Sequence, residues 1–95
     1  KCAQYATFGS EELARNAFDA MRGKKAVLLA NHGLLAGDKD LPTAFAIAEE
    51  IEFCAEIYYR SKSIGEPIIL SDTEMQLVEE KLKLYRQQRK KAEQD

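Results

Sequence analysis

Histidine and cysteine are scarce in this chain, which has one histidine and two cysteines among its 95 residues. The single histidine, His32, cannot build a catalytic zinc site alone, because such a site normally takes three protein ligands. Cys2 and Cys54 lie far apart and form no Cys-x-x-Cys pair, which favours reduced thiols in a cytoplasm over a disulfide framework. We expect both cysteines to be free, with Cys54 on the apolar face of a helix.

Long apolar runs and a strong charge of either sign are also missing. The chain has no run of the roughly 18 apolar residues that could span a bilayer, and its formal net charge at pH 7 is -2. It shows no signal-peptide pattern, internal repeat or low-complexity segment. We therefore expect neither a membrane nor a nucleic acid as partner.

His32 follows the one run of residues that reads clearly as a buried strand. The apolar segment from Ala26 to Ala30 predicts a strand covered on both faces, and Leu34 to Ala36 predicts an antiparallel return. Gly33 supplies the backbone freedom for the reversal between them. A strand end can aim an imidazole nitrogen at a fixed point, although position alone is more typical of a packed structural histidine.

One helix is predicted before this strand pair in the sequence and another after it. Ser10 can cap the first, which Gly23 ends. The second begins at Asp40 or Thr43 and extends to about Ser61. Their expected buried faces are Leu13, Ala14, Ala17, Phe18 and Met21 in the first, and Ile47, Ile51, Cys54 and Tyr58 in the second.

The last third of the chain predicts a third helix. Residues 71–74 have the spacing of a capping box, and Met75, Val78, Leu82 and Tyr85 form the apolar face that follows. Residues 68–70 are apolar and could form an edge strand or a strap across the core. Residues 87–95 are polar, and we expect this tail to fray.

Three segments resemble a known family in their order and their gaps. Residues 5–14, 25–36 and 80–85 together resemble the C-terminal part of the class II aldolase and adducin head family, with the fuculose-phosphate aldolases as the nearest branch. The resemblance implies an α/β fold, a layered α/β/α domain with a mainly antiparallel sheet. Residues 1–86 would be its C-terminal part, so we expect the chain to be a fragment that lacks an N-terminal half.

The resemblance also implies a chemistry for His32, which matches the third zinc ligand of the family. The other ligands, a His-x-His pair and a glutamate, and the phosphate-binding loops would lie upstream of Lys1. The implied reaction is zinc-dependent aldol cleavage of a phosphorylated ketose of the L-fuculose 1-phosphate type, which yields dihydroxyacetone phosphate and an aldehyde. Tyr85 matches a catalytic tyrosine that closes over the site, or else it only completes its helix face.

Other interpretations remain open at this point. Sugar-phosphate epimerases and a dehydratase belong to the same family, and an adducin-head-like module would keep the fold for assembly without zinc. The resemblance implies a homotetramer, and the cysteine usage favours a cytoplasmic location. Tyr5, Thr7 and Gly9 lie in a family-like segment, where we expect backbone or packing roles, and Tyr58 and Tyr59 are expected to pack or to lie in an interface.

Overall fold

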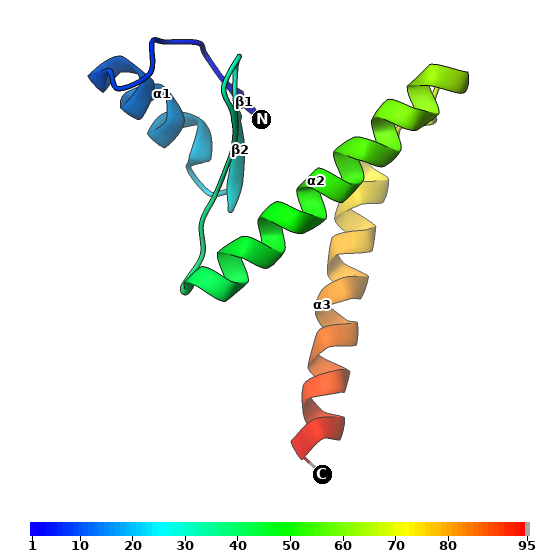
Figure 1. Cartoon of the computed structure of the whole chain (residues 1–95). Helices are drawn as coiled ribbons and strands as arrows, with labels where there is room; N and C mark the ends of the chain where they lie inside the picture. The colour runs from blue at the N-terminus through cyan, green and yellow to red at the C-terminus, as the bar shows by residue number, and fades with distance from the viewer. Residues whose placement is uncertain (95) are drawn as a thin grey trace. The chain divides into compact units, whose positions relative to one another are not determined.

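The computed structural model describes residues 1–94 and divides the chain into two compact units, with the second beginning at Gly65 (Figure 1). The first unit contains β1 (Cys2–Ala3), α1 (Glu11–Met21), β2 (Ala26–Leu29), β3 (Gly33–Ala36) and α2 (Leu41–Ile64). The second contains α3 (Asp72–Gln94). None of the helices in residues 1–94 combines the length and the apolar character that a membrane-spanning helix needs.

The sheet has the order β1-β2-β3 and is mixed. β2 and β3 pair antiparallel, with Val27 opposite Leu35, as the sequence predicts. β1 pairs with β2 in parallel and is held by bonds such as that from the Leu28 amide to the Lys1 carbonyl, at 3.0 Å. The prediction of a strand or strap at residues 68–70 is wrong, because that segment has no regular structure and its side chains are exposed. Its short apolar run is indistinguishable by pattern from a strand.

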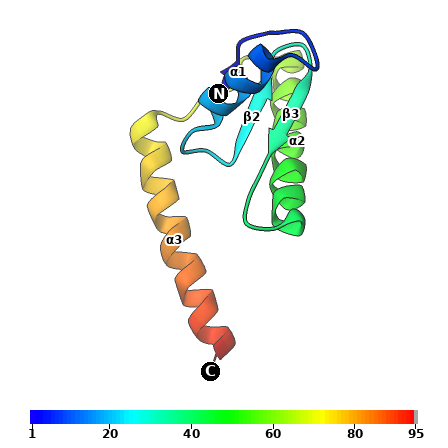
Figure 2. The same ribbon diagram turned by 90° about the vertical axis from the view of Figure 1, so that its left-hand side faces the viewer.

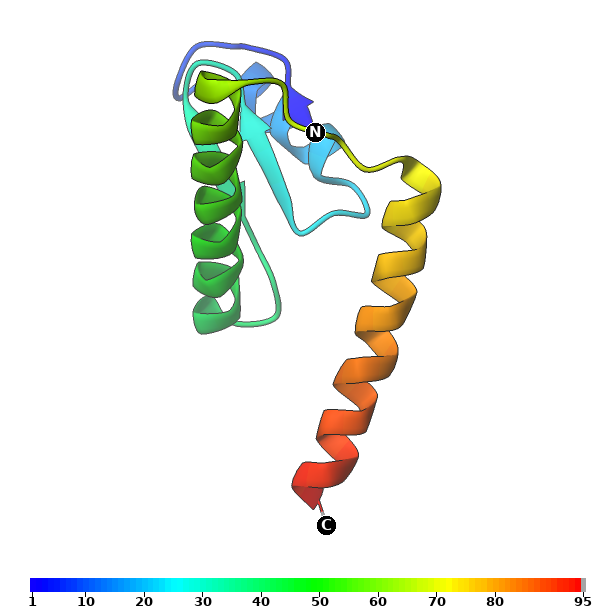
Figure 3. The same cartoon turned by 90° about the vertical axis from the view of Figure 1, so that its right-hand side faces the viewer.

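The core of the first unit is small and centres on Val27, which is 1% exposed. Ala3 and Ala20 complete it, and Met21 and Leu29 pack around them. α1 packs against β1 and β2, and α2 packs against β3 (Figures 2 and 3). The expectation that β2 is covered on both faces is wrong for this chain, since Leu28 remains 49% exposed.

α1 begins and ends where the sequence predicts. The Ser10 hydroxyl accepts a hydrogen bond from the Leu13 amide at 3.1 Å and donates one to the Thr7 carbonyl at 2.6 Å. Gly23 adopts a φ of +66° just after the helix, in the left-handed region that glycine tolerates best. The start and end of α1 thus follow from side chains and backbone within a few residues of its termini.

Replacing Ser10 by alanine is expected to lower the free energy of unfolding of the full-length protein by about 1 kcal/mol. The substitution leaves the Leu13 amide without its cap and the Thr7 carbonyl without the hydroxyl. Urea denaturation would measure the loss. Ser63→Ala is the matched control, because the Ser63 hydroxyl only bonds back to the Tyr59 carbonyl within α2. Equal stability of the Ser10 variant and the parent would contradict the capping role.

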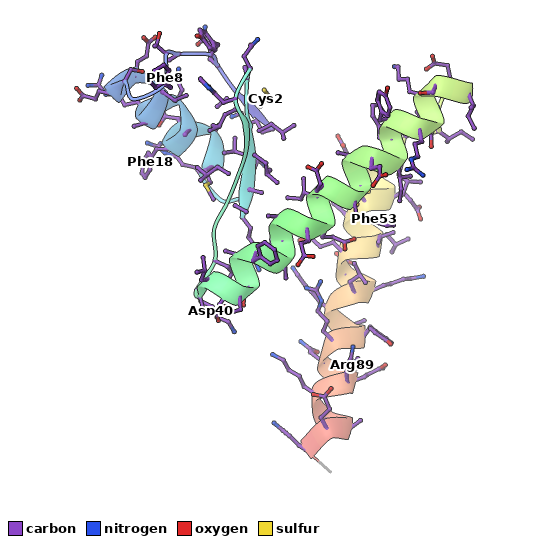
Figure 4. The ribbon with its side chains drawn as sticks, in the orientation of Figure 1. Cys2, Phe8, Phe18, Asp40, Phe53 and Arg89 are labelled. Carbon is purple, nitrogen blue, oxygen red and sulfur yellow. The ribbon has the colours of Figure 1, made fainter. Side chains whose placement is uncertain are left out.

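The buried face of α1 is narrower than its apolar pattern predicts. Ala17 and Ala20 are buried, but Phe18 is 67% exposed and projects away from the strands (Figure 4). The Arg22 guanidinium lies 5.4 Å from the centre of the Phe18 ring. Phe18 also lines an apolar hollow of about 490 Å³ with Leu35 of β3. The prediction that Phe18 is buried is therefore wrong within the part of the chain that the structure describes.

Asp40 is the residue that caps α2. Its carboxylate accepts a hydrogen bond from the Thr43 amide at 2.8 Å, and hydrogen bonds from Thr43 hold the pKa of Asp40 below its ordinary value. The pKa of Asp38 is lowered too, first by the Lys39 amide and then by Lys25, whose ammonium lies 3.1 Å away. These two carboxylates thus keep their charge where the chain turns from β3 into α2.

α2 continues to Ile64, slightly beyond its predicted end near Ser61. On its exposed side, Glu56 and Arg60 form an ion pair one helical turn apart, at 2.7 Å. Cys54 is exposed, so its predicted burial is wrong, and both cysteines are free as expected. The apolar pattern of α2 extends further along the helix than the part of it that packs on β3.

α3 forms the second unit and starts at its predicted cap. The Glu74 amide donates a hydrogen bond to the Ser71 hydroxyl at 3.1 Å. The helix extends to Gln94, so residues 87–94 are helical where we expected fraying. Their glutamines, lysines, arginine, alanine and glutamate are good helix formers, and Arg89 pairs with Glu93 at 3.4 Å.

Candidate functional site

His32 is the last residue of the turn that joins β2 to β3. Its backbone amide donates a hydrogen bond to the Leu29 carbonyl at 2.9 Å, which closes a four-residue turn. Asn31, the third residue of this turn, has a φ of +63°, and asparagine tolerates that conformation better than most residues. The turn is therefore set by local sequence, and it presents His32 at the end of the strand pair as predicted.

The imidazole of His32 uses one of its two nitrogens within the protein. Nε2 lies 2.8 Å from the carbonyl oxygen of Ala6. A carbonyl oxygen can only accept, so this hydrogen bond requires a proton on Nε2, and in the neutral form of the ring the lone pair is then on the other nitrogen. Histidines that bind metals commonly donate their second ring N–H to a backbone carbonyl in this way. The arrangement suits a neutral metal ligand.

Tyr5 contacts the same imidazole. The two ring centroids are 5.5 Å apart and the rings are inclined by 16°, so they are stacked. We expected only a backbone or packing role for Tyr5, and the sequence contains no signal for this contact because the two residues are far apart in the chain. Tyr5 and the carbonyl of Ala6 are the parts of the site that sequence reasoning missed.

The segment that carries Tyr5 and Ala6 is itself fixed. Ala6 is buried, and the side-chain amide of Asn16 in α1 donates a hydrogen bond from Nδ2 to the Gln4 carbonyl at 3.1 Å. The Thr7 carbonyl accepts hydrogen bonds from Ser10, and Gly9 has a φ of +71°. Thr7 and Gly9 therefore have backbone roles, as predicted. Through these bonds α1 fixes the loop before it, and this loop contacts His32.

A complete metal site is not present among the described residues. No three histidine, cysteine, aspartate or glutamate side chains in residues 1–94 are placed to hold a metal ion. His32 fits a zinc ion by the chemistry of its ring, with one nitrogen bonded to a carbonyl and the other carrying a lone pair. Within the described residues it would be a single ligand, not a complete set.

Tyr85, the second predicted site residue, lies on α3 in the second unit, whereas His32 lies in the first. Its side chain is 59% exposed, and it follows Met75, Val78 and Leu82 along the apolar face of the helix. An exposed phenol on that face is open both to a substrate and to a packing partner. The catalytic role of Tyr85 therefore stays a prediction.

Comparison with known proteins identifies a single family. Residues 1–59 match the Class II Aldolase and Adducin N-terminal domain. The chain is 54% identical over 88 residues to 5-deoxy-D-ribulose 1-phosphate aldolase of Bacillus thuringiensis, covering 93% of this chain and 41% of that protein. It is 42% identical over 85 residues to L-fuculose phosphate aldolase of Escherichia coli K12, covering 88% and 40%.

A solved structure agrees with these relatives. The chain superimposes on an L-fuculose 1-phosphate aldolase with a TM-score of 0.82 and 57% sequence identity. The match covers 87% of this chain and 39% of the solved one. The chain thus spans about two fifths of the length of the relatives it matches.

Proposed function

This chain belongs to the class II aldolase and adducin family, and we propose that His32 supplies one of the zinc ligands of an aldolase that cleaves a phosphorylated ketose. The observation that carries the proposal is the hydrogen bonding of the His32 imidazole. One of its nitrogens donates to the Ala6 carbonyl, and the other has a lone pair to offer a metal. The names of the relatives support the reaction class.

The chain's own residues have distinct tasks in this proposal. His32 lies at the end of a rigid hairpin. The lone pair of its neutral imidazole therefore keeps one direction relative to the sheet. Zinc, when bound, supplies Lewis-acid chemistry that polarises substrate oxygens as the carbon–carbon bond breaks. Tyr85 provides a phenol that can hold or move a proton at the C4 hydroxyl of the substrate, whose oxygen becomes the carbonyl oxygen of the aldehyde. The remaining ligands and the phosphate-binding loops come from outside residues 1–94.

The substrate class we propose is a ketose 1-phosphate. The relatives are named for 5-deoxy-D-ribulose 1-phosphate and for L-fuculose phosphate. Cleavage between C3 and C4 of such a sugar gives dihydroxyacetone phosphate from the phosphorylated end and an aldehyde from the other. The shared half is the phosphorylated end, so we expect selectivity to lie in how the aldehyde half is accommodated.

The direct test is a cleavage assay on the full-length protein loaded with Zn²⁺. We expect dihydroxyacetone phosphate to be released from L-fuculose 1-phosphate, from 5-deoxy-D-ribulose 1-phosphate or from both, and a coupled glycerol-phosphate dehydrogenase measures it. Treatment with a chelator should abolish the signal, and added zinc should restore it. Epimerisation or dehydration of these sugars without cleavage would refute the aldolase in favour of another enzyme of the family.

We propose that the described residues are part of a layered α/β/α domain with a mainly antiparallel sheet, and that residues 1–86 belong to it. The protein is a cytoplasmic homotetramer in this proposal. An adducin-head-like assembly module is the alternative of another class, and it predicts that the full-length protein binds no zinc and cleaves no sugar phosphate.

A further inference from the structure

The loop between β1 and α1 holds the His32 imidazole by two consecutive residues. Tyr5 stacks on one face of the ring, and the Ala6 carbonyl accepts the hydrogen bond from Nε2. The stack opposes tilting of the imidazole, and the hydrogen bond opposes its rotation about the bond to Cβ. Together the two contacts select one orientation of a side chain that is otherwise exposed.

The support for Tyr5 comes from both of its sides along the chain. β1 fixes the segment before it, through hydrogen bonds between Ala3 and Ala30 and between Lys1 and Leu28. α1 fixes the segment after it, because Ser10 bonds to the Thr7 carbonyl with both its amide and its hydroxyl. A ring carried by a backbone tied at both ends can act as a fixed surface.

From this geometry we propose that Tyr5 is a positioning residue for the metal-binding histidine. Its ring holds the imidazole of His32 in the orientation in which the free nitrogen binds zinc. The inference rests on the proposed function, since it assigns Tyr5 a part in the same site. The flat ring does this work, and the phenolic hydroxyl is not required.

The expected size of the effect follows from preorganisation. A ligand that is already oriented loses less rotational freedom when it binds a metal, so removing its support weakens binding. Substitution of groups that orient a metal ligand typically costs 10–100-fold in metal affinity. Because the Ala6 carbonyl still holds Nε2 when Tyr5 is changed, we expect the lower end, about 10-fold.

The experiment is a Zn²⁺ titration of the metal-free full-length protein against a fluorescent chelator. Tyr5→Ala is expected to weaken zinc binding about 10-fold, whereas Tyr5→Phe, which keeps the ring, binds zinc as the parent does. Tyr59→Ala is the matched control, because Tyr59 lies on α2 and is 74% exposed. Cobalt substitution adds a second readout: the visible bands of bound Co²⁺ should shift in Tyr5→Ala and not in Tyr5→Phe.

The outcomes separate this inference from the proposed function. Parental zinc affinity in Tyr5→Ala, with zinc lost in His32→Ala, would overturn the role of Tyr5 and leave the metal site standing. Full zinc binding by His32→Ala would overturn the proposed function itself. Equal weakening by Tyr5→Phe and Tyr5→Ala would refute the stacked ring as the cause. If Tyr5→Ala does not fold, Tyr5→Leu replaces it in the test, since leucine fills space without a flat ring. Parental zinc affinity in Tyr5→Leu would overturn the inference.

Discussion

Replacing His32 by alanine in the full-length protein is expected to remove bound zinc and to lower aldolase activity by at least about 100-fold, with the fold retained. The substitution deletes one metal ligand, but His32 is exposed at a turn and its backbone hydrogen bond to Leu29 remains possible. Metal analysis of the purified variant, alongside circular dichroism, measures both effects.

The competing interpretation, a structural histidine, predicts a different pattern. Loss of the bond between Nε2 and the Ala6 carbonyl would then lower stability by about 1–3 kcal/mol, and zinc content would not change. Asn31→Gly is the matched control, because glycine accepts the φ of +63° at that position and leaves the imidazole untouched. We expect this control to keep its zinc.

Replacing Tyr85 by phenylalanine is expected to lower kcat about 100-fold while zinc content stays at the parental level. Phenylalanine keeps the apolar face of α3, which Met75, Val78 and Leu82 also form, and removes only the hydroxyl that would move a proton. Steady-state cleavage assays on zinc-loaded protein measure the change.

Tyr59→Phe serves as the control for Tyr85→Phe, because it removes the hydroxyl of another exposed tyrosine, which lies on α2. If Tyr85 only completes its helix face, Tyr85→Phe should cleave the substrate as fast as the parent and as fast as Tyr59→Phe. That result would remove Tyr85 from the catalytic machinery, but it would leave the zinc ligand unaffected.

Local sequence was sufficient for most of the secondary structure. The caps at Ser10, Asp40 and Ser71 were predictable because each hydroxyl or carboxylate bonds to an amide three residues ahead. The strand pair around His32 was predictable because the turn and both strands lie within eleven residues, 26–36. The resemblance that identified the family rested on the same segments, and the comparisons confirm it.

Contacts between segments that are distant in the chain depended on the tertiary structure. The third strand comes from residues 2–3 and not from 68–70, since a short apolar run does not encode which partner it will find. The exposure of Phe18 and Cys54 shows that an apolar pattern predicts which face could be buried, but a neighbouring element must be present to cover it.

The site divides in the same way. His32 could be singled out from the sequence because its rarity and its turn are local properties. Its contacts with Tyr5 and Ala6 could not, because hydrogen bonding and ring stacking depend on the distance between atoms in space, and no spacing in the chain reports that distance. The candidate ligand can thus be found from the order of the residues, whereas the contacts that orient it exist only in the folded chain.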